Sequence, residues 1–320
     1  MPSLIVSSAE SDLRLDVFLA AKTGKSRSFI QEQLKAGRIQ INSQKGTKAS
    51  TRLNEGDHIL FELEDSATST LTPIPGPIEI LFEDDHLLVI NKAQGVVIHP
   101  APGHSTDTLV HHLLHYLSHE SLFKSPPDLR PGIVHRLDKG TSGVLLIAKN
   151  REVQEALSQQ FKERQVTKVY ECFVWGQLIR SGTLTTSIGR DRIHRKKMSS
   201  KTQKARSAET RFSPQKTFRH VTHLEVYPLT GRTHQIRVHL SEFGHSILGD
   251  SLYGKGATAK RVSHMDPELT AFIKSANHTF LHARSLTFSH PITSKEQHIE
   301  APRPETFNQL LDLLNKKDCL

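Results

Sequence analysis

Apolar and polar residues alternate with two different periods in the first part of the chain. Residues 15–21 form an apolar cluster typical of a short helix, and a second helix, capped by Ser26, ends at Gly37. Polar and apolar side chains then alternate over residues 38–42 and again over residues 57–63. Because such alternation indicates half-buried strands, the pattern predicts a small unit of two helices followed by two strands.

The remainder of the chain, from residue 78, contains more predicted strands than helices. Two short strands surround the acidic turn of ILFEDDHLLVINK, and an apolar stripe predicts a helix over 305–316. The other predicted elements are a helix at 107–117, a helix capped by Asn150, and strands at 144–149, 166–176, 219–226, 234–240 and 286–289. Since strands and helices do not alternate regularly, we expect an α+β domain with a mixed, largely antiparallel sheet.

A segment without apolar periodicity, DSATSTLTPIPGP, separates these two patterns. It is rich in Ser, Thr and Pro, which is typical of a semi-extended linker. The sequence therefore predicts a small α/β-type module at 14–64, a linker at 65–77 and a larger domain at 78–320.

The composition favours a cytoplasmic protein. The longest apolar runs, such as residues 144–148, are far shorter than the roughly 20 residues that span a bilayer. The first residues lack a basic head followed by an apolar stretch, and the two cysteines, Cys172 and Cys319, cannot form a disulfide framework. We therefore expect neither export nor membrane insertion. No pattern demands a protein partner, so we expect a monomer.

The charges indicate a polyanionic partner. The chain has 42 Lys and Arg against 33 Asp and Glu, a net charge of +9. Residues 22–52 contain eight basic side chains and one acidic one, whereas residues 53–85 contain nine acidic side chains and no Lys or Arg. A second basic cluster, GRDRIHRKKMSSKTQKAR at 189–206, has eight basic residues and one acid. This cluster is interpreted as a loop or hairpin arm that grips phosphates, with a solvated, disordered loop as the alternative.

The loop RPGIVHRLDKGTSGVLLIAK, residues 130–149, is the best candidate for chemistry. It places Gly, Pro and polar residues directly before an apolar strand, where a rigid scaffold can hold a functional loop. Asp138 is its only carboxylate, with Arg136 and Lys139 beside it. A nearby cation favours the ionised carboxylate, which can act as a nucleophile or a base. The alternative is that Asp138 only forms the turn.

Four blocks in this part of the chain resemble the RluA family of pseudouridine synthases. They are ILFEDDHLLVINKAQGVVIHP, HRLDKGTSGVLLIAK, VTKVYECFVWG and, taken together, PLTGRTHQIRVHL with HSILGDSLYG. Their order over residues 78–308 makes the resemblance specific. It implies a sheet with a central RNA-binding cleft, and an isomerase that converts uridine in RNA to pseudouridine without a cofactor or metal.

The resemblance also implies roles for four residues. Asp138 corresponds to the essential aspartate of the family, and Arg237 would pair with it. Tyr170 would stack near the target base and could remove the proton from carbon 5. Arg136 would fill the space that the uridine leaves in the RNA stack. The apolar residues Leu137, Val144 and Ile236 are candidate walls of a dry pocket, with ordinary core packing as the alternative.

The first module resembles the small RNA-binding module of ribosomal small-subunit protein four. The resemblance lies in LRLDVFLA, SRSFIQEQLKAGRIQIN and GDHILFEL. Together with the basic cluster it predicts contacts to RNA, with large-subunit ribosomal RNA as the expected partner. The candidate RNA-binding residues besides Arg136 are Lys25, Arg27, Lys35, Arg38, Arg195, Lys196 and Lys197.

Three other interpretations compete with this one. His111 and His115 lie four residues apart and could share a metal, but no third ligand is evident, so we expect no metal. A non-catalytic RNA-binding or ribosome-assembly factor would need neither Asp138 nor Tyr170. A hydrolytic nucleosidase is disfavoured because a second carboxylate is missing near Asp138.

Overall fold

The computed structural model divides the chain into two compact units, Met1–Thr70 and Leu71–Leu320. It describes residues 2–25, 27–44, 48–63, 71–100, 106–124, 131–194, 196–202, 205–254, 262–276 and 278–320. The predicted bounds of module, linker and domain stay predictions, and residues 64–70 and Ser26 lie outside the described residues. None of the described helices is both long and apolar enough to cross a membrane.

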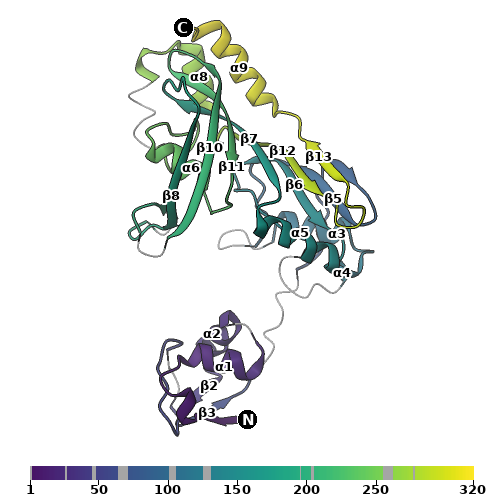
Figure 1. Ribbon diagram of the computed structural model, residues 1–320, viewed down its shortest axis with the longest axis vertical. Helices are drawn as coiled ribbons and strands as arrows, with labels where there is room; N and C mark the ends of the chain where they lie inside the picture. The colour runs from purple at the N-terminus through teal and green to yellow at the C-terminus, as the bar shows by residue number, and fades with distance from the viewer. Residues whose placement is uncertain are drawn as a thin grey trace. The chain divides into compact units, whose positions relative to one another are not determined.

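The first unit combines a three-stranded antiparallel sheet with two helices (Figure 1). Its sheet has the order β1-β3-β2. The elements are β1 (Ser3–Ile5), η1 (Ser8–Glu10), α1 (Leu15–Thr23), α2 (Arg27–Lys35), β2 (Ile39–Ile41) and β3 (His58–Phe61). Both predicted helices and both predicted strands are confirmed. Strand β1 was not predicted, because three residues are too few to show the alternation of a strand. Phe18, Ile30 and Ile59 are fully buried in the core of this unit.

A ten-stranded sheet forms the second unit, with the order β4-β5-β6-β12-β7-β11-β10-β8-β9 and β13 paired to β12. The pairings among described residues are antiparallel except that of β6 with β12, so the expected largely antiparallel sheet is confirmed. The strands are β4 (Ile80–Glu83), β5 (Leu87–Lys92), β6 (Ser142–Ala148), β7 (Thr167–Trp175), β8 (Gly182–Arg190), β9 (Met198–Ser199), β10 (Arg206–Thr217), β11 (Val221–Pro228), β12 (Leu281–Ser289) and β13 (Glu296–Glu300).

Helices cover the sheet at two places (Figure 1). Those beside β5 and β6 are α3 (Leu109–Tyr116), α4 (Ser121–Lys124) and α5 (Arg151–Glu163); the others are α6 (Gln235–Glu242), η2 (Val262–His264), α8 (Pro267–Ser275) and α9 (Glu305–Lys317). The predicted start of α5 is confirmed, because the Asn150 side chain accepts a hydrogen bond from the Val153 amide at 3.0 Å.

The predicted strand at 234–240 is wrong, because these residues begin helix α6. Ile236, Val238 and Leu240 alternate with other residues in the sequence, which resembles a strand. In the structure Gln235 and His239 are buried as well, so apolar and polar positions lie on several sides of the helix. Periodicity alone does not separate a buried helix of this length from a strand.

The basic cluster is a hairpin tip. Strands β8 and β10 pair antiparallel, and β9 pairs with the end of β8. Between them lies a segment that we call the basic arm, defined as residues 191–194 and 196–202. The expected hairpin arm is therefore confirmed. Its two long strands were missed because threonines stand among their inward positions, Thr186 in β8 and the buried Thr210 in β10, and interrupt the apolar alternation.

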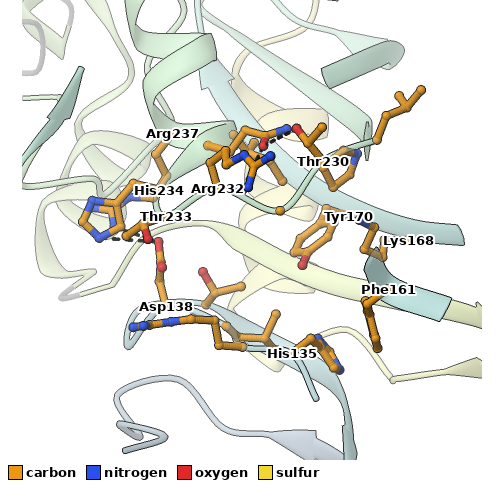
Figure 2. A pocket seen from close by; sticks show the side chains of 18 of the residues that line it. His135, Asp138, Phe161, Lys168, Tyr170, Thr230, Arg232, Thr233, His234 and Arg237 are labelled. Carbon is orange, nitrogen blue, oxygen red and sulfur yellow. Dashed lines mark hydrogen bonds and ion pairs between the residues drawn. The ribbon is translucent and has the colours of Figure 1, made fainter. Parts of the chain in front are cut away.

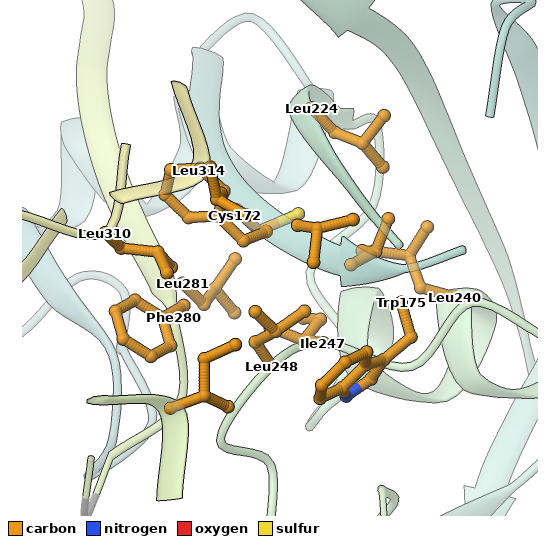
Figure 3. Packing of buried hydrophobic residues seen from close by; sticks show 14 of the residues in the cluster. Cys172, Trp175, Leu224, Leu240, Ile247, Leu248, Phe280, Leu281, Leu310 and Leu314 are labelled. Atoms are coloured by element: carbon orange, nitrogen blue, oxygen red, sulfur yellow. The ribbon is translucent and has the colours of Figure 1, made fainter. Parts of the chain in front are cut away.

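The main core of the second unit lies between β7, β11 and three helices (Figure 3). Side chains from α6 and α9 meet those of β7 and β11 there. The labelled residues are Cys172, Trp175, Leu224, Leu240, Ile247, Leu248, Phe280, Leu281, Leu310 and Leu314. This packing fixes α6 against the centre of the sheet.

Strand β6 approaches β12 closely at Gly143. Its φ of +111° lies in a region that L side chains rarely adopt. A Cβ atom at this position would overlap the backbone of Ala283. Glycine therefore permits the parallel contact that fixes the loop immediately before β6.

A network of ion pairs around Glu171 connects β7 to β12 and to the segment before α9. Glu171 is 1% exposed and accepts two hydrogen bonds from Arg303, at 2.6 and 2.9 Å, and one from Arg284 at 3.1 Å. Burial raises the pKa of Glu171, but hydrogen bonds from His223 and Arg303 outweigh it and hold this pKa below its ordinary value. Tyr170, the preceding residue, points to the opposite face of the strand.

Candidate active site

Asp138 lies in the loop that leads directly into β6. Beneath it Leu137 is buried, and the Thr141 amide donates a hydrogen bond to the Asp138 carbonyl at 3.0 Å. On the other side the Gly95 amide donates to the Lys139 carbonyl at 2.8 Å. The side chain of Asp138 is 17% exposed. The carboxylate is therefore held by a rigid loop and is still reachable.

Arg237, on α6, joins two carboxylates. Its Nη1 donates to Asp138 Oδ2 at 3.0 Å, while Nε and Nη2 donate to the two oxygens of Asp250 at 2.7 and 2.9 Å. Burial lowers the pKa of the guanidinium, but the two carboxylates outweigh it and raise this pKa above its ordinary value. Asp250 is buried, and the amides of Leu252 and Tyr253 also donate to it. The bidentate pair thus fixes the orientation of Arg237 toward Asp138.

His234 precedes α6 in the left-handed conformation, with φ of 55°. Its Nε2 is 3.8 Å from Asp138 Oδ2, and its Nδ1 is 2.8 Å from the Tyr253 hydroxyl oxygen. Burial lowers the pKa of His234, and the cations Arg237 and Arg136 lower it further, against the opposing effect of the carboxylates. The imidazole is therefore neutral near pH 7.

A cavity of about 450 Å³ opens between Asp138 and Tyr170 (Figure 2). Asp138, His234 and Arg237 lie on one side and Tyr170, Lys168 and Phe161 on the other. Of the predicted wall residues, Leu137 and Ile236 line this cavity. The prediction for Val144 is wrong, since its side chain packs in the core on α5. Val144 and Leu137 are both apolar residues next to the motif, so the sequence alone could not separate them.

Tyr170 forms part of the cavity wall. Burial raises the pKa of its phenol, and the charge of Asp138 raises it further. The phenol therefore keeps its proton at neutral pH. Within the described residues no hydrogen-bond partner is found for its hydroxyl, so the ring and the hydroxyl are both available to a ligand.

The charges around the cavity favour an anionic ligand. Asp138 is the one acidic residue among the described residues that line it. The cationic lining residues are Arg136, Lys162, Arg164, Lys168, Arg232 and Arg237. Lys168 lies two positions before Tyr170 on the same face of β7, and burial lowers its pKa to about 8, as does the nearby Arg164. This is the arrangement expected for a nucleotide with flanking phosphates.

A second cavity, of about 700 Å³, adjoins the first at Asp138. The two share Arg136, Leu137, Asp138, His234 and Arg237. Asp138 therefore stands at the junction of two hollows, one of which contains Tyr170. A polymer with the reacting unit in one cavity can continue into the other.

Lys92, at the end of β5, is a buried cation near this junction. It is 1% exposed, and its Nζ donates to the carbonyls of Ala93 and Val96 at 2.8 and 3.0 Å. Burial lowers its pKa to about 8, and the charge of Asp138 opposes that shift. At neutral pH Lys92 therefore adds positive potential at Asp138.

The predicted RNA-binding residues lie in three places: the junction of the cavities, the basic arm and the first unit. Arg136 is exposed at the junction of the cavities, and Lys196 and Lys197 lie on the basic arm. Arg195 lies outside the described residues. The structure brings Arg136 to the same site as Asp138, Tyr170 and Arg237, while their proposed roles stay predictions.

The four candidates in the first unit lie on or next to α2. Lys25 and Lys35 are exposed, and the Lys25 ammonium lies 5.3 Å from the Phe29 ring centre. Arg38 donates to Gln33 at 3.3 Å. Arg27 donates at 2.8 Å to Asp16, a buried carboxylate. Arg27 therefore also has a structural role, which its place in a basic run did not indicate.

Sequence reasoning missed His234, Asp250, Tyr253, Lys168 and Lys92 as site residues. Lys168 could have been predicted from the sequence, because side chains two positions apart in a strand lie on the same face, and Tyr170 is two positions after Lys168. Asp250 and Tyr253 lie in the segment HSILGDSLYG, but the sequence does not show that the turn after α6 returns them to Arg237. Among the described residues no cluster of three or more His, Cys, Asp and Glu suited to a metal is found.

Comparison with known proteins identifies both units. Residues 86–242 match the family described as RNA pseudouridylate synthase, and residues 13–59 match the S4 domain. Two human structures, of RNA pseudouridylate synthase domain containing 1 and 4, share the fold with TM-scores of 0.54 and 0.57. Each is 24% identical to this chain; they cover 76% and 74% of it, and 97% and 93% of their own lengths are matched.

Relatives also match over nearly the whole chain. An uncharacterized RNA pseudouridine synthase of Chlorobaculum parvum is 38% identical over 97% of this chain and 96% of its own. A protein of Vibrio cholerae named ribosomal large subunit pseudouridine synthase D is 37% identical, over 94% of this chain and 90% of its own. The chain therefore belongs to the RNA pseudouridine synthases, isomerases that convert uridine in RNA to pseudouridine, and it carries an N-terminal S4 domain.

Proposed function

We propose that this enzyme isomerises specific uridines of large-subunit ribosomal RNA and uses Asp138 as its nucleophile. The observation that carries the proposal is a reachable carboxylate, fixed by Arg237 at 3.0 Å, facing Tyr170 across a cavity whose other charges are cationic. Relatives named ribosomal large subunit pseudouridine synthase D support the choice of RNA.

The reaction rearranges the nucleotide without a change of oxidation state. Asp138 acts as the nucleophile while the bond between the ribose and N1 of uracil breaks. The uracil turns within the cavity, and its carbon 5 forms the new bond to the ribose while the bond between the ribose and the Asp138 carboxylate, formed in the first step, breaks. The proton on carbon 5 leaves and N1 binds a proton, so the atoms balance. One carboxylate is sufficient, because no water has to be activated as in a glycosidase.

The uridine has to leave the RNA stack before the enzyme can reach it. Extrusion costs a few kcal/mol and is easiest in loops and strained helices. Arg136, exposed beside Asp138, is placed to fill the vacated space with its planar guanidinium. The ring of Tyr170 supplies a face on which the extruded base can stack. Since its phenol is protonated at rest, Tyr170 can remove the carbon 5 proton only after its own proton has moved.

Tritium release from RNA labelled at carbon 5 of uridine tests the proposal. We expect wild-type enzyme to release tritium from an unmodified transcript of bacterial large-subunit ribosomal RNA. Asp138→Asn keeps the shape of the side chain but removes its charge, and we expect no release above background from it. Binding of the same transcript by both proteins, measured by filter retention, controls for folding.

Two other outcomes would overturn the proposal. Tight RNA binding without tritium release from ribosomal RNA, transfer RNA or assembly intermediates would favour the non-catalytic RNA-binding or assembly factor. Free uracil among the products would instead show hydrolysis of the glycosidic bond. Release from transfer RNA alone would contradict the choice of substrate but keep the isomerase.

A further inference from the structure

The basic arm is tied to both ends of α6, the helix that carries Arg237. At one end the Met198 amide donates a hydrogen bond to the Tyr253 hydroxyl oxygen at 2.8 Å, and this hydroxyl also contacts His234. At the other end the Ser200 amide donates to Glu242 Oε1 at 3.1 Å. The short strand β9 therefore lies along α6 and is hydrogen-bonded near both ends of this helix.

One tautomer of His234 gives the hydrogen bonds between the arm and Asp138 a consistent direction. Burial raises the pKa of Tyr253 to about 12, so its hydroxyl keeps its proton. In this tautomer the hydroxyl oxygen accepts the Met198 N–H while the hydroxyl proton is donated to His234 Nδ1. A neutral His234 that accepts at Nδ1 carries its own proton on Nε2. This Nε2–H is the group that faces Asp138, 3.8 Å away.

We propose that Tyr253 is a positioning residue that couples the contact of the basic arm with RNA to the alignment of Asp138, acting through His234 and Arg237. Besides the hydroxyl contacts, the Tyr253 ring lies 5.1 Å from the Arg237 guanidinium carbon. The inference rests on the proposed function, because it assigns to this chain of contacts a role in the isomerisation.

The basic arm has the charge to sense the RNA backbone. Its described basic side chains are Arg192, Lys196, Lys197 and Lys201, with Asp191 as the one acid. Lys196 is exposed, and the ammonium of Lys197 lies 5.8 Å from the centre of the Tyr253 ring. A phosphate bound by Lys196 would fix the backbone of the arm two residues before Met198. Correct seating of the arm thereby favours the orientation of His234 and Arg237 that catalysis needs.

Tyr253→Phe tests the role of the hydroxyl, because it keeps the ring on Arg237 and removes only the contacts to Met198 and His234. We expect the single-turnover rate constant for tritium release to fall by about 10- to 100-fold, as for a small misplacement of catalytic groups. The enzyme concentration at half-saturation should stay the same. Tyr227→Phe is the matched control, since its hydroxyl bonds Glu225 outside both cavities, and it should behave as wild type.

Two substitutions of His234 test the direction of the hydrogen bonds. The amide of His234→Gln places an N–H near the position of Nε2, whereas His234→Asn reaches only the position of Nδ1. We expect the Gln variant to be the more active. Backbone strain alone predicts the reverse, because Asn adopts the left-handed conformation of residue 234 more readily. A more active Asn variant would therefore refute the Nε2–H contact with Asp138.

A double-mutant cycle tests the coupling. We expect Lys196→Ala to slow tritium release at saturating enzyme in the wild-type background and to have no further effect on this rate in Tyr253→Phe. Independent effects in the two backgrounds, or wild-type kinetics of Tyr253→Phe, would overturn the inference while the proposed function stands. An inactive wild-type enzyme would instead overturn the proposed function. Equal melting temperatures of Tyr253→Phe and Tyr227→Phe exclude misfolding as the cause of a slower reaction.

Discussion

At the scale of single residues, the site depends on a carboxylate that does not face the cavity. Arg237 contacts Asp138 with one nitrogen and Asp250 with two. The sequence motif predicted the first contact but not the second, because nothing in the spacing shows that the turn after residue 249 returns to α6. The sequence therefore predicted Asp138 and Arg237, which lie nearest the substrate, but not Asp250, which orients Arg237.

Asp250→Asn should impair both stability and activity. The amide keeps one acceptor, but it loses the charge and turns a donor toward the guanidinium. We expect the free energy of unfolding to fall by about 2 to 4 kcal/mol, measured by urea denaturation, together with slower tritium release. Asp312→Asn is the control, since Asp312 is exposed on α9. Activity unchanged from wild type would show that Asp138 alone orients Arg237.

His135 should make the protein sensitive to acid. Its Nε2 accepts a hydrogen bond from the Leu146 amide at 2.9 Å, and burial lowers its pKa to about 3. In the unfolded chain a histidine titrates near 6.5. The unfolded state therefore binds one more proton between these values, so the stability that neutral His135 contributes is present above about pH 6.5 and is lost as the pH falls toward 3.

His135→Gln isolates this effect, because Gln can still accept from the Leu146 amide and does not titrate. We expect the free energy of unfolding of wild type to fall more steeply than that of the variant between pH 6.5 and pH 4. Denaturant titrations at several pH values measure both slopes. Parallel curves would mean that His135 is protonated in the folded state as readily as in the unfolded state.

At the scale of elements, sequence patterns predicted the helices that local interactions determine and missed the elements that tertiary packing determines. The Asn150 cap acts within one turn, and the apolar stripe of α9 repeats within the helix itself, so both helices were predicted correctly. Helix α6 was predicted as a strand because it is buried on several sides, and β8 and β10 were missed because threonines at inward positions interrupt their apolar alternation. Tertiary contacts that the sequence pattern does not encode settle these three elements.

Strand β7 provides a test at this scale, because it presents Lys168 and Tyr170 to the same cavity. With a pKa lowered by burial to about 8, Lys168 loses its charge as the pH rises through 8. We expect the affinity of wild type for the ribosomal transcript to fall between pH 7 and pH 9. Lys168→Arg stays charged over this range and should show a smaller fall, measured by filter binding at constant ionic strength. An equal fall in both proteins would exclude a phosphate contact by Lys168.

At the scale of the whole molecule, the chain joins two units with separate cores. The first contains the S4 domain and the second contains the candidate active site. If both units bind one RNA, the second contact becomes intramolecular once the first has formed. The expectation that the first unit helps RNA binding and the second performs the chemistry stays a prediction.

Removal of residues 1–70 should therefore weaken RNA binding and spare the chemistry. We expect roughly 100-fold weaker binding of the ribosomal transcript, with tritium release from a short stem-loop substrate retained at saturating enzyme. Lys25→Ala combined with Lys35→Ala in the full chain is a milder companion, because both side chains are exposed. Unchanged affinity of the shortened protein would exclude a role of the first unit in holding RNA.

The ion pairs of Glu171 also bear on when β7 can fold during synthesis of the chain. Arg303 follows Glu171 by 132 residues and Arg284 follows it by 113, so a nascent chain contains the buried carboxylate long before either arginine partner. An unpaired buried charge is strongly unfavourable, and we expect β7, with Tyr170 on its other face, to settle only after both have been translated. Tyr170, although translated long before residue 303, would then reach its place in the cavity wall only after that residue.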